Sequence, residues 1–122
     1  MRKLSINRDY YVIAGYDLTG YETDIFEDWK WSTDSDKFRC YQREGQIQFF
    51  DDPMAGDYLY FGYILAHGDE YECPTGKINV SKIEEVKSDV ENKLQELINQ
   101  GVISEGCKPN ILYQILAFEE CS

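Results

Sequence analysis

The chain has 122 residues, of which 43% are hydrophobic and 15% aromatic, so it can bury one hydrophobic core but not a second, independent one. Asp and Glu number 23 against 12 Lys and Arg, which gives a formal net charge of -11. Because nucleic acids and anionic membranes attract cationic surfaces, this charge disfavours direct binding to either. We therefore expect a single acidic domain spanning residues 1–122.

The amino-terminal third predicts one strand and one loop. Residues 9–18 are dense in Tyr, Val and Ile and are followed by Thr19 and Gly20, a pattern typical of a strand that ends in a turn. Residues 24–31 fit a short helix and a strand equally well, so we expect a loop there with one helical turn.

The middle of the chain predicts three more strands. Residues 37–42 and 46–50 flank a short connection that contains Gly45, which indicates a hairpin. Residues 58–66 are almost continuously apolar, which favours a central strand of a sheet. The sequence His67-Gly68-Asp69-Glu70 predicts the turn that ends this strand.

The carboxy-terminal third predicts one long helix and a closing strand. Ser81 and Glu84 form a capping box, apolar residues follow at helical spacing, and Gly101 is suited to end the helix, so we expect a helix over 82–100. Residues 110–118 predict a buried strand. Together these elements predict an α+β domain with a mainly antiparallel sheet of about five strands and the helix packed on one face.

The sequence gives little support for catalysis. His67 is the only histidine, and no nucleophile lies in a recognisable catalytic motif. Adjacent carboxylates such as Asp51 and Asp52 point to opposite faces of a strand, which disfavours a hydrolase. We therefore expect a protein that is not an enzyme.

A structural zinc site is an open alternative. His67 and four cysteines are suitable ligands, but no Cys-x-x-Cys pair occurs, so we expect no cofactor and keep zinc as the alternative. The amino terminus lacks a signal-peptide core, and no run of about 18 apolar residues occurs, so we expect a cytoplasmic protein, in the cytosol of a host cell.

Acidic loops with neighbouring aromatic residues are the main functional signal. Acids gather at 22–28, at 51–57 and at 69–72, and carboxylates in such loops can imitate the phosphates that cationic grooves bind. Solvated surface acids are the plain alternative. The residues that we expect to contact a partner are Asp51, Asp52, Asp57, Tyr58, Asp69, Glu70, Tyr71 and Glu72.

In size, diffuse negative charge and aromatic loops, the chain resembles the small acidic anti-CRISPR proteins that phages encode. The resemblance implies a DNA-mimicking inhibitor that binds the basic nucleic-acid channel of a larger protein, such as a CRISPR effector nuclease, and blocks DNA loading or access. The alternative is a small accessory or interaction domain, with or without zinc, that docks through a sheet edge or exposed aromatic residues.

Overall fold

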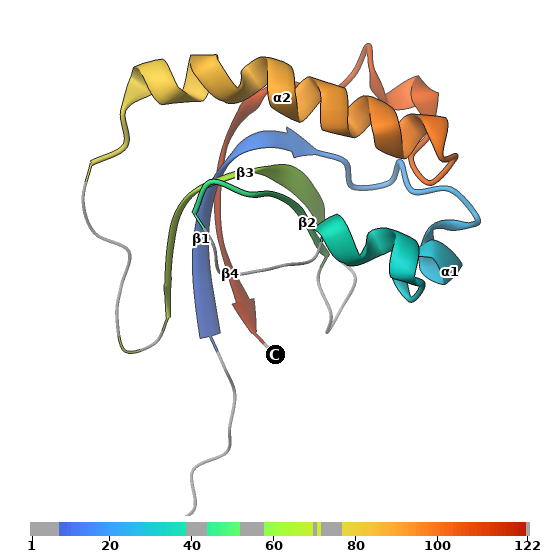
Figure 1. Ribbon diagram of the computed structural model, residues 1–122, viewed down its shortest axis with the longest axis horizontal. Coiled ribbons are helices and arrows are strands. Elements are labelled where there is room, and N and C mark those ends of the chain that lie inside the picture. Colours follow the sequence, from blue (N-terminus) through green and yellow to red (C-terminus); the bar gives the residue numbers. More distant parts are fainter. Residues whose placement is uncertain (1–7, 39–43, 52–57, 70, 72–76, 122) are drawn as a thin grey trace, which may run out of the picture.

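The computed structural model describes residues 8–38, 44–51, 58–69, 71 and 77–121. Within these ranges the chain forms an α+β fold with one antiparallel sheet of four strands (Figure 1). The strands are β1 (Arg8–Asp17), β2 (Ile47–Asp51), β3 (Leu59–Asp69) and β4 (Gln114–Cys121), in the spatial order β2-β3-β1-β4. The helices are α1 (Phe26–Lys30) and α2 (Val80–Asn99), with two 3-10 turns, η1 (Thr33–Phe38) and η2 (Glu105–Cys107).

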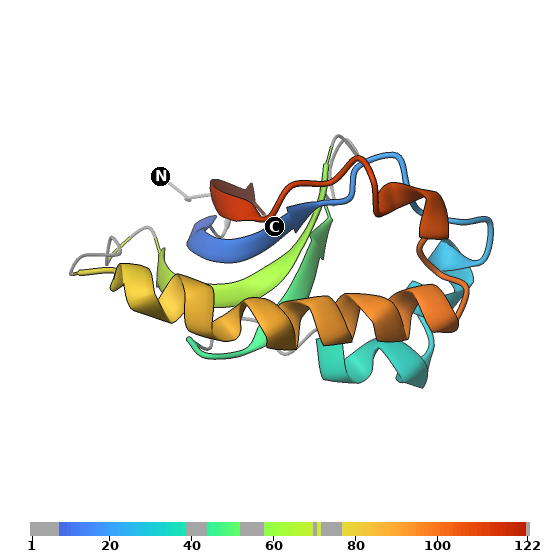
Figure 2. The same cartoon turned by 90° about the horizontal axis from the view of Figure 1, so that it is seen from above.

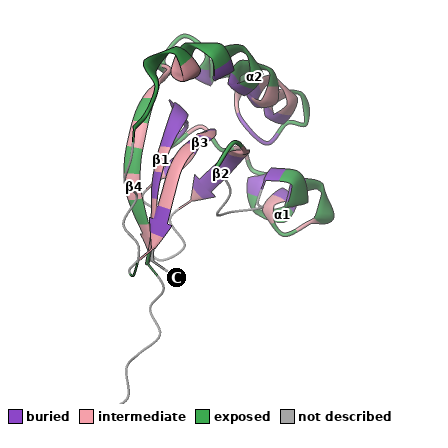
Figure 3. Cartoon of the chain, turned by 60° about the vertical axis from the view of Figure 1, so that its left-hand side comes forward, coloured by how far each residue is buried: buried purple, intermediate pink, exposed green. Residues whose placement is uncertain are grey.

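The helix α2 crosses one face of the sheet, as the sequence predicts (Figure 3). Its buried side chains, Val86, Val90, Leu94 and Leu97, recur at helical spacing. They pack with residues of the sheet and of α1 in the larger core cluster, which includes Tyr16, Phe49, Phe61 and Trp29. Seen from above, α2 runs along the molecule and its carboxy-terminal half lies near α1 and η1 (Figure 2).

The ends of α2 follow from local chemistry. Asn79 is the N-cap, and its side chain accepts a hydrogen bond of 3.0 Å from the backbone N–H of Ser81. The predicted N-cap, Ser81, is therefore wrong by two residues: Ser81 is the second residue of the helix, and its hydroxyl donates to the side chain of Asn79 at 2.7 Å. At the other end Gly101 has a φ of +78°, the left-handed conformation that the sequence predicts for it.

The two middle strands, β3 and β1, approach each other closely at a pair of glycines. Gly15 and Gly62 are direct partners in the antiparallel register. A Cβ atom on Gly62 would lie 2.5 Å from the carbonyl oxygen of Ala14, and one on Gly15 would lie 2.0 Å from that of Phe61. Glycine at these two positions therefore permits the backbones to pack as they do.

A second cluster lies on the opposite face of the sheet. Tyr11, Ile13, Phe50 and Ile64 are buried there, with partly buried aromatic and aliphatic residues around them. The ring of Tyr11 lies 4.7 Å from that of Phe50, measured between centroids. Both faces of the sheet therefore contribute apolar packing.

One predicted strand is absent where the structure describes its residues. Lys37 and Phe38, expected to begin a strand over 37–42, belong to η1, and residues 39–43 lie outside the described ranges. The hydroxyl of Ser35 donates to the carbonyl oxygens of Lys30 and Ser32, which stabilises a turn instead. The sheet accordingly has four strands among the described residues, not about five.

The strand β3 is longer than predicted, and β4 is less buried. His67, Gly68 and Asp69 continue β3, because they pair with β1, and do not form a turn. The strand does occupy the predicted interior position, between β2 and β1. The expected strand over 110–118 begins only at Gln114, since the backbone N–H groups of Asn110 and Ile111 bond to Cys107, and it lies at the sheet edge with alternate residues exposed.

Candidate functional site

Four of the predicted contact residues lie in the described ranges. They are Asp51, Tyr58, Asp69 and Tyr71, whereas Asp52, Asp57, Glu70 and Glu72 lie outside the described residues. Asp51 ends β2 opposite Leu59 at the start of β3, and Asp69 ends β3. The described acids of the two predicted clusters, Asp51 and Asp69, therefore lie at opposite ends of β3.

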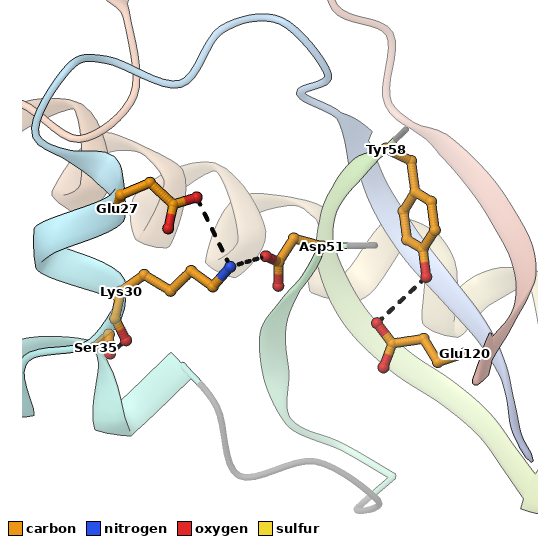
Figure 4. Close-up of polar contacts among 6 residues, drawn as sticks. All are labelled: Glu27, Lys30, Ser35, Asp51, Tyr58 and Glu120. Carbon is orange, nitrogen blue, oxygen red and sulfur yellow. Dashed lines mark hydrogen bonds and ion pairs between the residues drawn. The ribbon is translucent and has the colours of Figure 1, made fainter. Parts of the chain in front are cut away.

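Asp51 is an ion-paired and largely covered residue. Its carboxylate binds the ammonium group of Lys30 from α1, and the two side chains are only 17% and 12% exposed (Figure 4). Lys30 also lies 3.9 Å from the carboxylate of Glu27. The charge of Asp51 is thus neutralised within the molecule, which makes this residue a poor phosphate mimic.

Tyr58 and Tyr71 differ in exposure. Tyr58 is half-buried: its ring stacks on Tyr60 at 4.7 Å, and its hydroxyl donates to Glu120 at 3.4 Å (Figure 4). Tyr71 is 82% exposed, and its backbone N–H donates to the carboxylate of Asp69 at 2.9 Å. Of the two aromatic contacts predicted, Tyr71 is the more exposed.

A different acidic surface is fully described. The segment 24–38, which we call the α1–η1 arm, contains α1 and η1 and projects beside β2 (Figure 1). Its exposed carboxylates are those of Asp24, Glu27, Asp28, Asp34 and Asp36. Asp28, Asp34 and Asp36 line a broad, open depression together with Lys37, Ile25 and Trp29.

The core holds the α1–η1 arm in place. The indole ring of Trp29 packs against Phe38 and Phe49, with centroids 5.9 and 5.5 Å away. The indole N–H of Trp29 donates to the side-chain carbonyl of Gln100, just past α2, at 2.8 Å. Because the Trp29 ring is buried in the core and its indole N–H bonds to Gln100, the arm is anchored to the rest of the fold.

Both lysines of the α1–η1 arm are engaged with acids from elsewhere. Lys30 turns inward to Asp51, and the ammonium of Lys37 lies 3.5 Å from Glu96 on α2. The arm also exposes two large apolar side chains, Trp31 at 73% and Ile25 at 48%. It thus combines a net negative surface with an exposed aromatic ring, the combination that the sequence predicts for residues 49–72.

The sequence shows the acids over 22–28, but the residues that it predicts to contact a partner lie over 51–72. Asp34, Asp36 and Trp31 are absent from that prediction, although acids and tryptophans alternate over 24–36 and this pattern could have indicated them. Only the fold shows that η1 continues the acidic surface of α1.

His67 and Cys107 are the two residues considered for catalysis and metal binding whose side chains the structure describes. His67 lies in β3 with its Nε2 atom 3.1 Å from the carboxylate of Asp9 and its ring 4.8 Å from that of Tyr11. Cys107 is buried, and burial raises the pKa of its thiol, which keeps it protonated. Within the described ranges no three His, Cys, Asp or Glu side chains are grouped to hold a metal ion; Cys40, Cys73 and the side chain of Cys121 lie outside them.

Comparison with models of known protein families, with curated protein sequences and with solved structures found no match. Among the helices in the described ranges, none has the length and apolar character needed to cross a membrane.

Proposed function

We propose that the protein is an acidic inhibitor that binds the basic nucleic-acid channel of a larger nucleic-acid-handling protein. A CRISPR effector nuclease is the partner that we favour, and the consequence would be blocked loading or access of DNA. The observation that supports the proposal is the α1–η1 arm, which displays more exposed carboxylates than lysines. Its two lysines pair with Asp51 and Glu96 outside the arm, and Lys30 also lies 3.9 Å from Glu27 within it.

The chemistry of the α1–η1 arm suits a cationic groove. Lys and Arg side chains that grip phosphates bind carboxylates by the same charge-assisted hydrogen bonds. Trp31 is 73% exposed, and its ring already attracts a cation, since the ammonium of Lys30 lies 5.2 Å from the ring centroid. Since these groups are solvent-exposed, the interaction should weaken steeply as salt is added.

The first experiment is a binding assay against a panel of CRISPR effector nucleases, each with and without guide RNA. Binding should compete with target DNA, and saturating inhibitor should block cleavage of labelled target. If none of the panel binds, or if target DNA and the protein bind the same effector together, the proposed function is wrong.

A charge-matched pair of triple variants tests the site. Asp24→Asn, Asp28→Asn and Asp34→Asn remove three exposed carboxylates of the α1–η1 arm. We expect affinity to fall about 10- to 100-fold, because each exposed ion pair contributes about 0.5–1 kcal/mol. The control removes three exposed carboxylates elsewhere, through the substitutions Glu84→Gln, Asp89→Asn and Glu105→Gln. Equal losses in both triples would mean that net charge, and not this surface, drives binding.

A second function, docking through a sheet edge, has its own support. The strand β4 pairs with β1 alone among the described strands, so its outer edge is open to a further strand. Ile115, at 48%, exposes an apolar side chain on β4, and Leu112, at 68%, exposes one just before the strand begins. Binding that persists in 1 M salt and is lost in Leu112→Gln with Ile115→Thr would favour this accessory role over the inhibitor.

A further inference from the structure

A separate cleft lies between α2 and the segment that connects η2 to β4. Its volume is about 540 Å³, within the range of small-molecule sites. One wall consists of Lys87, Glu91 and Gln95, which are spaced four residues apart and so form one stripe of α2. Tyr16 of β1 and Tyr113 also line the cleft, as do the apolar side chains of Leu94 and Ile111.

The second wall of the cleft is anchored to the fold. The hydroxyl of Tyr113 donates to the backbone carbonyl of Ile83 on α2. The backbone N–H of Ile111 donates to the carbonyl of buried Cys107 at 3.0 Å. The rings of Tyr16 and Tyr113 lie 5.6 Å apart between centroids. The cleft is therefore shaped before a ligand arrives.

The charges in this cleft are unusual for so acidic a protein. Arg8, Lys30, Lys37, Lys82 and Lys93 each have a carboxylate within 4 Å. By contrast, Lys87 and Lys108, which both line the cleft, have no ion pair within the described part of the chain. The ammonium of Lys108 donates to the side-chain carbonyl of Gln95, and that of Lys87 lies 5.6 Å from the ring centroid of Tyr113.

The one carboxylate that lines the cleft is already bonded. Glu91 accepts a hydrogen bond of 3.4 Å from the hydroxyl of Tyr16. Burial, reinforced by the charge of Glu91, raises the pKa of Tyr16 to about 12, so its hydroxyl keeps its proton at neutral pH. Two ammonium groups, of Lys87 and Lys108, line the cleft against one carboxylate. Burial raises the pKa of Tyr113, and the charge of Glu84, which does not line the cleft, reaches this residue and helps to raise that pKa. Acids elsewhere are screened at physiological salt beyond about 8 Å.

We propose that this cleft binds a small amphipathic anion, an aromatic ring that carries one carboxylate or phosphate group. The ring lies over Leu94 and Ile111 beside the two tyrosines, and the anionic group binds Lys108 and Lys87 at the mouth. Both lysine side chains are exposed at the surface, so an incoming anion reaches them without displacing the core. This site is distinct from the α1–η1 arm, since no residue of the arm lines it.

The test uses four probes of similar size on the full chain: phenyl phosphate, phenylacetate, benzyl alcohol and phenethylamine. Titrations followed by amide chemical shifts should show binding of the two anions, with changes at Leu94, Ile111 and Tyr113. Benzyl alcohol should bind at least about tenfold more weakly, since it lacks the charge-assisted contact. The ratio between phenyl phosphate and phenylacetate identifies the preferred anionic group. Binding of the alcohol or the amine as tight as that of the anions would overturn the proposal.

Variants that remove a positive or a negative charge from the cleft distinguish an anion-binding site from an apolar one. Lys87→Met and Lys108→Met should each weaken phenyl phosphate about tenfold, whereas Glu91→Gln should strengthen it several-fold by removing a like charge. Lys93→Met is the matched control, because Lys93 lies on α2, pairs with Glu96 and does not line the cleft. A loss in Lys93→Met equal to that in Lys108→Met, or no gain in Glu91→Gln, would refute the assignment. Binding to an effector nuclease should be unchanged in all four variants, so the two proposals fail independently.

Discussion

Replacing Asp51 should destabilise the fold, although the sequence suggests a surface residue that is free to change. Its carboxylate holds Lys30 between β2 and α1, where the two side chains are 17% and 12% exposed. The substitution Asp51→Asn leaves the Lys30 ammonium without its main partner in a poorly solvated position. Asp51→Lys places a second cation there.

The size of the effect follows from the exposure of the pair. Breaking a fully buried ion pair costs about 3–5 kcal/mol, whereas an exposed pair contributes about 0–1 kcal/mol. At this partial burial we expect Asp51→Asn to lower the free energy of unfolding by about 2 kcal/mol. Two like charges about 4 Å apart repel by about 4 kcal/mol at an effective dielectric constant of 20, so Asp51→Lys should lose roughly twice as much.

Urea unfolding followed by circular dichroism measures these changes. Glu27→Gln is the control: Glu27 is 73% exposed and its carboxylate is 3.9 Å from Lys30, so the loss should stay below about 0.5 kcal/mol. The double variant Lys30→Met with Asp51→Asn should recover much of the stability, because no charge is left unpaired. A urea midpoint for Asp51→Lys equal to that of the unmodified protein would show that this ion pair does not stabilise the fold.

Three further changes test the fold. Gly62→Ala should lower the free energy of unfolding by about 2 kcal/mol, because the new Cβ atom would lie 2.5 Å from the carbonyl oxygen of Ala14. Gly106→Ala is the control in the same urea assay and should be nearly neutral, because its Cβ atom would meet only a side-chain oxygen at 3.4 Å. Burial raises the pKa of Tyr16 from 10.0 to about 12. The protonated hydroxyl therefore contributes fully to the free energy of unfolding below pH 10, and this contribution is lost as the pH rises to 12. Tyr16→Phe should flatten the fall in the free energy of unfolding measured between these pH values. Asn79→Ala removes the cap of α2 and should cost about 1 kcal/mol by urea unfolding, with a matching loss of helical circular dichroism near the midpoint.

The sequence predicted those elements whose signals are local. The helix α2 was predictable because buried residues recur at helical spacing ahead of Gly101, and β3 because its apolar run suits a strand covered on both faces. The strand expected to begin at Lys37 does not begin there, because Ser35 and Ser32 donate to nearby backbone carbonyls and stabilise a turn that ends at Phe38. Short-range apolar patterns do not report such bonds. The turn expected at 67–70 failed because pairing with β1 overrides the turn preference of Gly68.

The candidate site was harder to predict, because a charged side chain can be neutralised by a partner that is far away in the sequence. Residues 49–72 contain no Lys or Arg, so the sequence suggests that Asp51 is a solvent-exposed acid without an ion-pair partner. Its partner Lys30 lies 21 residues earlier, on another element. In the same way, the exposure of Asp28 and Asp34 depends on Trp29 anchoring the α1–η1 arm, and the sequence alone could not distinguish its buried tryptophan from the exposed Trp31.

Lys30 also links the two acidic regions, which gives a sharper test of what Asp51 does. By pairing with Asp51 it contributes no net charge to the α1–η1 arm, although it belongs to the arm's sequence. In Asp51→Asn the freed ammonium should turn toward Glu27, already 3.9 Å away, and cancel part of the arm's negative charge. We therefore expect this variant to weaken partner binding severalfold without any direct contact at position 51, and the double variant Lys30→Met with Asp51→Asn to restore it. If Asp51 itself touches the partner, as the sequence predicts, the double variant will bind as weakly as Asp51→Asn alone.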